Sequence, residues 1–297
     1  MLTGFVLLGG SLITVLFFFA LAVLRGTDAA ETQNYIQTLL TDPKAGRAGW
    51  YDLITLQGAS SIGTFILPCL LYWYAVEHKP LSAFNVRPLS AVRALGAVVV
   101  LVIAFMPVDG LFIEWNQNLD LPASLEPLER WMRDTEDRAA VATKTLTTFA
   151  TIGQLLTALL VIALLPAIGE ELLFRGILQR KLVTLTGGVH AGIWLTAVLF
   201  SAIHVQFYGF VPRMLLGALF GYLYAWSGNL WVPMLAHFVN NGFTVLMVYF
   251  YQQKQISVDI ESTDSVPWYG ALASLIATVL LMAYFRRENQ LNAPLNR

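Results

Sequence analysis

Three short groups of polar residues stand out because each is set in an apolar stretch of the chain. They are Glu170-Glu171-x-x-x-Arg175, Phe200-x-x-x-His204 and His237-x-x-x-Asn241. An ionisable side chain in the interior of a bilayer costs at least about 2.5 kcal/mol, so residues of this kind are candidates for function. Carboxylate, imidazole and amide groups are also the donors and acceptors that hydrolysis of a peptide bond requires.

The two neighbouring glutamates of the first group face different sides of a helix. Glu171 and Arg175 are four residues apart, so they can pair on one helical face. Glu170 is turned by about 100° from Glu171 and cannot share that face, so its carboxylate can face a cavity. A helix that emerges into water with an ordinary surface ion pair is the alternative that this group alone leaves open.

The histidine groups have equally plain alternatives when each is taken alone. His204 can be a satisfied core residue, and His237 with Asn241 can be a polar contact between packed helices. Taken together, one glutamate, two histidines and an amide occur in three separate apolar segments. Burying each of them in isolation is costly, so we expect Glu170, His204, His237 and Asn241 to converge on one wet cavity.

Such a cavity can hydrolyse a peptide bond without a serine or cysteine nucleophile. A carboxylate in a poorly solvated site can accept a proton from water, and a neutral histidine can orient that water. Imidazole and amide N–H groups suit the oxyanion of the tetrahedral intermediate, and each such donor is worth about 3 kcal/mol in the transition state.

The three motifs, in this order and each on an apolar segment, resemble those of the CPBP intramembrane proteases. That family contains the CAAX prenyl endopeptidases of the Ras-converting type and bacterial relatives linked to bacteriocin processing and immunity. The resemblance covers about Leu155–Tyr251. It implies an all-helical fold and an endopeptidase that cleaves a membrane-associated or CAAX-like protein substrate in or near the membrane.

The resemblance also implies a role for each motif residue. Glu170 looks like the general base, and His204 looks like its partner in holding and activating a water. His237 and Asn241 look like the groups that stabilise the oxyanion. Glu171 and Arg175 look like structural support for the first motif.

A zinc version of the site uses the same atoms. His204, His237 and Glu170 could bind zinc and leave one position open for water. Against this version, the histidines lack the compact His-x-x-x-His spacing of helical zinc proteases. Glu171 would also have to act as the base while it pairs with Arg175. We therefore favour the mechanism without a cofactor and keep zinc as the alternative.

Two other classes of function use intramembrane carboxylates and histidines. A transporter or proton relay is one, but no inverted repeat or matched pair of broken helices is apparent. A non-catalytic protein that binds a peptide or a partner, such as an immunity factor, is the other. The complete motifs favour catalysis over this reading.

The segments that carry these motifs predict a polytopic all-α membrane protein. The chain has 297 residues, of which 57% are hydrophobic and 12% are charged, where soluble chains carry about 25% charged residues. Apolar runs near the length needed to span a bilayer predict about eight transmembrane helices. They are Leu2–Leu24, Leu53–Val76, Arg93–Val108, Ile152–Ile168, Val189–Val205, Phe210–Trp226, Leu230–Tyr251 and Trp268–Phe285.

The connections predict three parts along the chain. Residues 1–150 hold the first helices and an amphipathic segment at about 120–148, which lies along the membrane surface or is a plain solvated helix. Residues 151–251 hold the catalytic helices, and 252–297 hold the last span and a cytoplasmic tail. No Lys or Arg precedes the first run, so we expect a retained anchor rather than a signal peptide.

The net charge and the cysteine content limit the classes of partner and of covalent cross-link. A net charge of −1 gives no basic field for nucleic acid. The single cysteine, Cys69, cannot form an internal disulfide. Basic residues near the helix ends favour both termini in the cytoplasm. The expected partners are the lipid bilayer and a protein or peptide substrate, with or without an attached lipid, and the expected location is the cell (inner) membrane if the source is bacterial.

Overall fold

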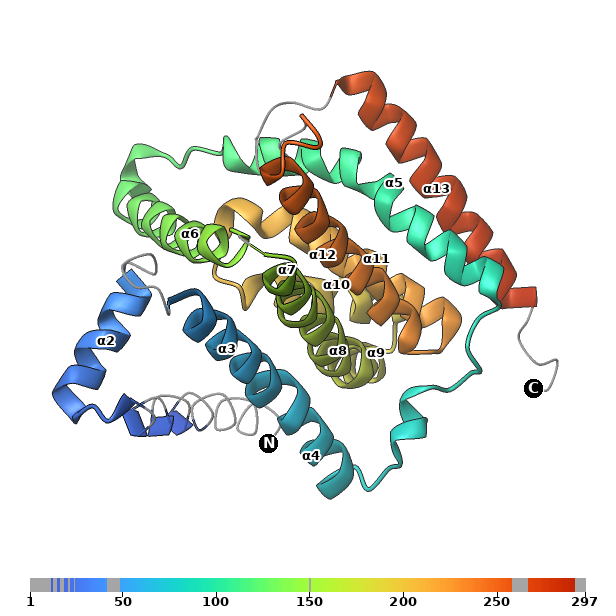
Figure 1. The fold of residues 1–297 in the computed structure, drawn as a ribbon. Helices are drawn as coiled ribbons and strands as arrows, with labels where there is room; N and C mark the ends of the chain where they lie inside the picture. Colours follow the sequence, from blue (N-terminus) through green and yellow to red (C-terminus); the bar gives the residue numbers. More distant parts are fainter. Residues whose placement is uncertain are drawn as a thin grey trace. The chain divides into compact units, whose positions relative to one another are not determined.

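A computed structural model describes residues 25–41, 49–149, 151–257 and 267–291, with a few further positions between 12 and 23. The described residues form helices and no strand, as the sequence predicts. The α-helices are α2 (Ala29–Thr41), α3 (Gly49–Ser61), α4 (Leu67–Ala75), α5 (Val92–Gln117), α6 (Glu126–Leu146), α7 (Ile152–Ala158), α8 (Leu165–Glu171), α9 (Arg180–Thr186), α10 (Val189–Ala202), α11 (Phe210–Ser227), α12 (Trp231–Gln252) and α13 (Trp268–Leu291) (Figure 1).

Short π-helical and 3₁₀ segments connect or interrupt these helices. The π-helical segments are η1 (Ile62–Ile66), η4 (Leu159–Leu164) and η5 (Leu172–Gln179). The 3₁₀ segments are η2 (Leu81–Phe84), η3 (Ala123–Leu125) and η6 (Phe207–Gly209). Because η1, η4 and η5 continue directly into α-helices, α3 to α4 and α7 to α9 each form one long helical rod.

Within the described residues, five helical segments are long and apolar enough to cross a membrane. They are Gly49–Ala75, Val92–Gln117, Ile152–Thr186, Trp231–Gln252 and Trp268–Gln290. The chain is therefore an integral multi-pass membrane protein, as its composition predicts. Of the other predicted spans, Phe210–Trp226 matches α11, and Leu2–Leu24 lies largely outside the described residues. The total of about eight spans stays a prediction.

The predicted span Val189–Val205 is too long by three residues. α10 ends at Ala202, and the chain then turns. The amide of His204 bonds to the carbonyl of Ser201, and the amide of Val205 bonds to that of Ala202, which tightens the last turn. His204 therefore lies in the turn that follows the helix rather than deep inside it.

Two of the π-helical segments end just before a Leu-Pro pair. η1 precedes Leu67-Pro68, and η4 precedes Leu165-Pro166. Proline lacks an amide hydrogen, so it cannot bond to the carbonyl four residues earlier, and its ring crowds that carbonyl. A wider π turn before each proline is the local adjustment, and such turns are often found at functional sites.

The chain divides into two compact units, each built from three segments of the sequence. The first unit comprises residues 1–80, 137–173 and 241–259, and the second comprises 81–136, 174–240 and 260–297. Three of the boundaries fall within helices, namely within α6, within the α7–α9 rod and within α12. The predicted division into three parts along the chain stays a prediction.

The first unit packs α3 and η1 against η4 and α8. Its buried residues include Trp50, Leu53, Ile54, Leu146 and Val161. The indole N–H of Trp50 donates to the carbonyl of Leu146 at 3.2 Å, which joins the start of α3 to the end of α6. Burial of this apolar set stabilises the unit, while the remaining apolar surface of its spans is suited to lipid.

The second unit is organised around α5, which lies beside α13 along much of its length (Figure 1). Pro107 interrupts the bonding of α5. The hydroxyl of Ser274 on α13 bridges the next pair along the helix, because it accepts a hydrogen bond from the amide of Val108 at 3.0 Å and donates one to the carbonyl of Ala104. One side chain from the neighbouring helix thus reconnects an opened turn.

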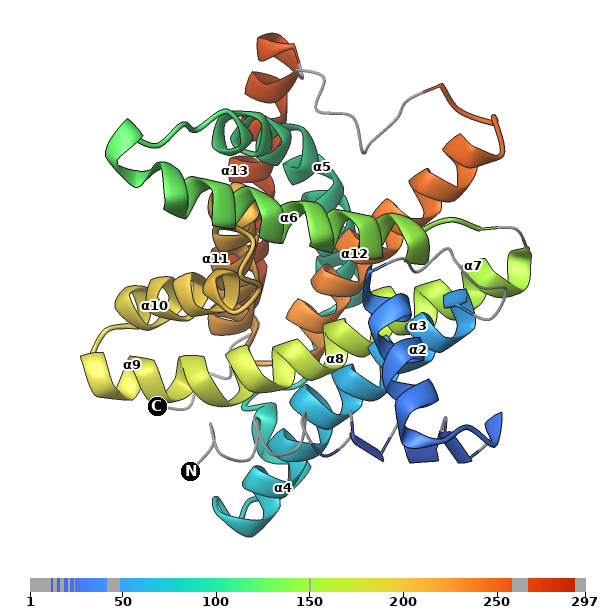
Figure 2. The same cartoon turned by 90° about the vertical axis from the view of Figure 1, so that its left-hand side faces the viewer.

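Small residues let the other helices of the second unit approach closely. α10 packs on α11 and on α9 (Figure 2). A Cβ atom at Gly192 would come within 2.7 Å of the backbone nitrogen of Val183, so no other residue fits there without a shift. Gly217 and Gly221 form a Gly-x-x-x-Gly pair on α11, a pattern that favours close packing of membrane helices.

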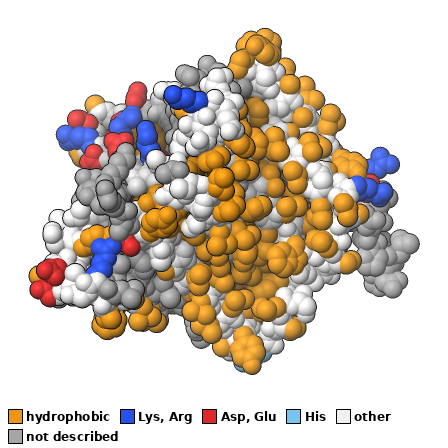
Figure 3. All heavy atoms as spheres, in the orientation of Figure 1, with side chains coloured by type: hydrophobic (Ala, Val, Ile, Leu, Met, Phe, Trp, Pro, Cys, Tyr) orange, Lys and Arg blue, Asp and Glu red, His pale blue; other side chains and the backbone are white. Residues whose placement is uncertain are grey.

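The surface of the second unit is suited to lipid along α5 and α13. Apolar side chains gather over these two helices (Figure 3), and those exposed on α13 include Leu275, Ile276, Val279 and Leu280. Charged side chains gather over α6 and at the end of α13. The predicted amphipathic segment at about 120–148 is thus a helix over Glu126–Leu146, and its place along the membrane surface stays a prediction.

Candidate active site

The first motif begins on α8, in the first unit. Glu170 is partly exposed, whereas Glu171 is fully buried at 0% exposure. Gly169 sits just before them because a Cβ atom there would come within 2.8 Å of the side chain of Phe65 and 3.0 Å of that of Ile66. The absence of a side chain at Gly169 therefore lets the backbone of α8 lie close to η1.

Arg175 lies in the second unit, on the π-helical segment η5. Its side chain is 0% exposed, and it donates a hydrogen bond of 2.8 Å to the carbonyl of Gly217 on α11. The guanidinium also lies 4.8 Å from the ring centre of Phe200 and 5.5 Å from that of Phe220. The sequence predicts a regular α-helix through residues 170–176, but the α-helix ends at Glu171 and the π turn changes the register from Leu172 onward.

His204 is oriented by its own backbone. Its Nδ1 lies 2.8 Å from the carbonyl oxygen of Phe200, one turn earlier. A carbonyl oxygen can only accept, so Nδ1 carries the hydrogen and Nε2 of the neutral ring is the acceptor. The next residue, Val205, has a φ of 53°, a left-handed conformation that branched side chains rarely adopt. The chain therefore turns sharply just after the histidine.

His237 lies on α12 and is buried, with 4% exposure. Its ring stacks on Phe220 at a centroid distance of 5.3 Å and meets the edge of Phe200 at 6.2 Å. The ring of His204 lies 5.3 Å from that of Phe200. Phe200 therefore contacts both imidazoles and the guanidinium of Arg175, so three motif residues of the second unit meet at one aromatic side chain.

Asn241 is the first residue of α12 that belongs to the first unit. Its Nδ2 donates to the carbonyl of Ile162 on η4 at 3.2 Å. Ile162 lies four residues before Pro166, so an α-helix would leave this carbonyl without its usual amide partner. The amide of Asn241 is thus oriented by a backbone acceptor that Pro166 makes available.

The structure groups the predicted site residues in two sets. His204, His237 and Arg175 meet around Phe200 in the second unit, whereas Glu170, Glu171 and Asn241 belong to the first. The convergence of all four proposed catalytic residues stays a prediction. The sequence reasoning overlooked Phe220 and Gly217, although the Gly-x-x-x-Gly pair signals a close helix contact at that point.

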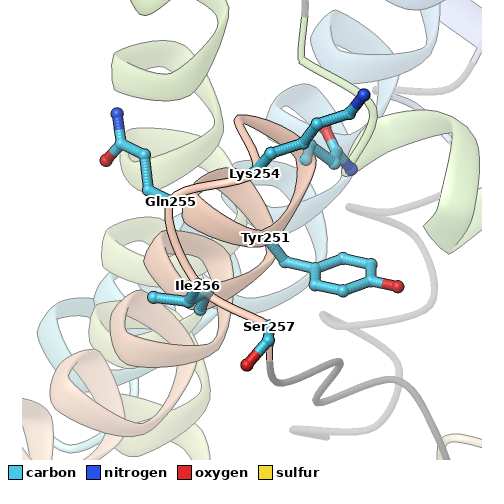
Figure 4. A pocket seen from close by; sticks show the side chains of 6 residues that line it. Tyr251, Lys254, Gln255, Ile256 and Ser257 are labelled. Carbon is cyan, nitrogen blue, oxygen red and sulfur yellow. The ribbon is translucent and has the colours of Figure 1, made fainter.

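Metal-binding clusters and pockets were compared with the predicted site residues. Among the residues that the structure describes, no three His, Cys, Asp or Glu side chains gather as a metal site requires. An open pocket lies at the end of α12 in the first unit (Figure 4). It is lined by Tyr251, Gln252, Lys254, Gln255, Ile256 and Ser257, and no predicted site residue is among them.

Comparisons with known proteins agree with the motifs. Residues 152–243 match the family model described as type II CAAX prenyl endopeptidase Rce1-like. The “Uncharacterized protein YpbD” of Bacillus subtilis (strain 168) is 38% identical over 82 residues, which are 26% of this chain and 39% of the relative. The “Putative membrane peptidase YdiL” of the same organism is 32% identical over 89 residues, which are 30% of this chain and 36% of the relative.

The similarity covers well under two thirds of either relative, and no solved structure matches the chain. The matched segment starts at the beginning of α7 and ends just after Asn241, so it contains all three motifs. The resemblance to the CAAX prenyl endopeptidase group predicted from Glu170-Glu171, His204 and His237-x-x-x-Asn241 is therefore confirmed for residues 152–243, which match the Rce1-like family.

Proposed function

We propose that this chain is an intramembrane endopeptidase in which Glu170 activates a water molecule. The observation that carries the proposal is the match of residues 152–243 to the Rce1-like family, with every motif residue inside the matched segment. The meeting of His204 and His237 at Phe200 supports it, because two imidazoles, one from the turn after α10 and one from α12, both contact the same ring.

The proposed reaction needs only water and the peptide. The carboxylate of Glu170 takes a proton from water while the water oxygen bonds to the carbonyl carbon of the scissile bond. Nε2 of His204 accepts a hydrogen bond from the same water and orients it. His237 and Asn241 donate to the oxyanion of the tetrahedral intermediate. The C–N bond then breaks, and the proton held by Glu170 passes to the leaving amine.

Local structure supports the roles of the two histidines and of Asn241. The carbonyl of Phe200 fixes the tautomer of His204 that leaves Nε2 as an acceptor. The stack on Phe220 fixes the plane of the His237 ring, and the carbonyl of Ile162 orients the amide of Asn241. Groups held in this way need little reorganisation in the transition state, which is the main source of electrostatic catalysis.

The decisive experiment compares cleavage by the wild type and by Glu170→Gln. Protein purified in detergent is incubated with a library of quenched fluorescent peptides, and the products are sequenced by mass spectrometry. Glu170→Gln keeps the shape of the side chain but removes the base, so kcat/KM should fall by about 10²–10⁴-fold. A matched control is Glu126→Gln on α6, whose exposed carboxylate pairs with the exposed Arg130 at 3.8 Å.

The contrary outcomes are equally specific. Wild-type protein that leaves every peptide intact would contradict the proposal, and uptake of a solute by vesicles containing it would favour the transporter reading instead. A Glu170→Gln variant that cleaves as fast as the wild type would keep the peptidase but remove Glu170 as its base.

The substrate class is tested in the same assay. We propose a membrane-associated protein substrate, for which a peptide ending in a CAAX-like sequence is the first probe. Two peptides of the same sequence, with and without a prenyl group on the cysteine, are compared at equal concentration in micelles. A preference for the prenylated peptide would show recognition of the lipid, and equal rates would limit recognition to the peptide.

A further inference from the structure

The turn that carries His204 is held by residues outside the three motifs. After α10 ends at Ala202, residues 203–206 lead into η6 and then into α11. This stretch, residues 203–209, is called the histidine turn below. Val205 has a φ of 53° in it, so the backbone beside His204 is in a conformation that needs support from its surroundings.

Asn116, in the last turn of α5, provides two of the contacts to this region. It is 3% exposed. Its Nδ2 donates to the carbonyl of Phe207 at 2.9 Å, and its Oδ1 accepts from the amide of Val211 at 2.8 Å. One amide side chain thus uses both of its polar atoms to bridge from the histidine turn to the first turn of α11.

The bond to Val211 replaces a missing helix cap. The N-cap residue of α11 is Gly209, which has no side chain that could accept from the first amides of the helix. Asn is among the best capping residues, and here it comes from another helix rather than from the N-cap position itself. Asn116 therefore fixes where α11 begins and, through Phe207, where the histidine turn lies.

Two further contacts hold the same region from its flanks. The hydroxyl of Ser201 on α10 donates to the carbonyl of Phe210 at 2.6 Å. Arg213 on α11 donates to the side-chain oxygen of Gln206 at 2.8 Å. Both residues lie within segments adjacent to the turn, whereas Asn116 is 91 positions away from Phe207 in the sequence.

We infer that Asn116 is a positioning residue for His204 in the proposed peptidase reaction, because it fixes both the turn that follows the histidine and the start of α11. It lies outside residues 152–243, so the second motif depends on a helix that the family match does not include. This role rests on the proposed function. The contact that it requires, called the tether below, is the hydrogen bond from Asn116 on α5 to Phe207 in the histidine turn.

The experiment uses two variants of Asn116 and one control in full-length protein in detergent. Asn116→Leu removes both hydrogen bonds at similar size. Asn116→Asp keeps an acceptor for Val211 but removes the donor to Phe207. The control is Asn118→Leu, because Asn118 is the exposed C-cap residue of α5 and its side chain donates to the carbonyl of Glu114 in the same helix.

The expected result is a loss in kcat with little change in KM. A displacement of a catalytic group by about 1 Å can cost about 10²-fold in rate, so Asn116→Leu should lower kcat by about that factor. Asn116→Asp should lower kcat less, and Asn118→Leu should match the wild type. Rates are divided by the folded fraction measured by thermal unfolding, so that a loss of folded protein does not count as a loss of catalysis.

A second measurement tests the tether without any substrate. Hydrogen–deuterium exchange of the peptide containing residues 203–211 should be faster in Asn116→Leu than in the wild type and unchanged in Asn118→Leu. Unchanged exchange, or faster exchange with an unaltered kcat in both Asn116 variants, would overturn the inference while leaving the peptidase intact. Wild-type protein that cleaves no peptide would instead remove the proposed function, and the positioning role with it.

Discussion

Arg175 donates to the carbonyl of Gly217, and one turn further along, Gln179 donates to the carbonyl of Gly221 at 3.0 Å. Side chains four residues apart on one helical rod thus meet carbonyls four residues apart on α11. A Cβ atom at Gly221 would lie 2.9 Å from the side-chain oxygen of Gln179, and one at Gly217 would lie 3.2 Å from the ring of Phe200, so a larger residue at either position would crowd its neighbours. The carbonyls of the Gly-x-x-x-Gly pair therefore accept hydrogen bonds from two buried polar side chains.

This contact predicts that Arg175→Lys is destabilising although it keeps the charge. A lysine has a compact ammonium that cannot lie flat against Phe200 and Phe220 while it bonds to Gly217. Loss of a hydrogen bond to a charged group costs about 1.5–3 kcal/mol, and thermal unfolding in detergent should show a loss of this size. The control is Arg180→Lys, since Arg180 also donates to a carbonyl, that of Ala83, but is partly exposed. Equal losses at both positions would contradict the special role of Arg175.

Two glycine-to-alanine changes should have opposite effects on stability. At Gly192 the new methyl group would meet the backbone of Val183 at 2.7 Å, and overpacking of this kind costs about 1–3 kcal/mol. At Gly96, in α5, a Cβ atom would meet nothing within 4 Å. Alanine favours the helix there, so Gly96→Ala should be neutral or raise the unfolding temperature, with a gain of about 0.4–1 kcal/mol. A loss of stability at Gly96 as large as that at Gly192 would contradict the open space around Gly96, and no loss at Gly192 would contradict the close packing between α9 and α10.

The sequence predicts the spanning helices well because their signal is local. Long apolar runs at 53–76, 93–108, 152–168, 230–251 and 268–285 all fall in helices long enough to cross a membrane. The ends of helices depend on contacts that are distant in sequence. Asn116 caps α11, and Ser201 reaches Phe210, so the stop of α10 at Ala202 could not be predicted from its apolar pattern.

The candidate site shows the same division between local and distant information. The polar groups that break apolar runs identify Glu170, His204 and His237 as exceptional residues, and the order of their motifs identifies the family match. Spacing cannot show that Phe200 contacts both imidazoles, because that contact depends on how α10, α11 and α12 pack. A helical wheel assumes a constant angle per residue, so it cannot reveal the π turn at η5.

Two substitutions on α13, each of which removes a hydroxyl group, test the hydrogen-bonded bridge that Ser274 makes between Val108 and Ala104 of α5. Ser274→Ala removes the group that joins Val108 and Ala104, so we expect a loss of about 1 kcal/mol. Thr278 lies one turn later, is also buried, and its hydroxyl has no hydrogen-bond partner among the described residues. Thr278→Val keeps the shape and should be neutral or stabilising. The free energies of unfolding in detergent measure both, and a larger loss for Thr278→Val would be inconsistent with the bridge.

Metal removal separates the two versions of the proposed mechanism. In the favoured version Glu170 is the base and no cofactor takes part, so protein treated with a chelator and shown to be metal-free should keep its full rate of cleavage. In the zinc version the same treatment should abolish cleavage, and added Zn²⁺ should restore it. Metal content is measured by elemental analysis on the same sample, and loss of activity together with bound zinc would reverse our preference.

Replacement of Pro166 tests the orientation of Asn241. Pro166→Ala restores an amide hydrogen that can bond to the carbonyl of Ile162 and compete with the side chain of Asn241. The gained backbone bond should leave the unfolding temperature unchanged or higher, whereas kcat should fall, because one oxyanion donor is worth about 10²–10³-fold in rate. Pro68→Ala is the matched control, since Pro68 follows the π-helical segment η1 as Pro166 follows η4, and its helix, α4, carries no predicted site residue. We expect Pro68→Ala to change stability in the same direction without a loss of kcat. A Pro166→Ala variant with full activity would show that the carbonyl of Ile162 does not set the position of the Asn241 amide.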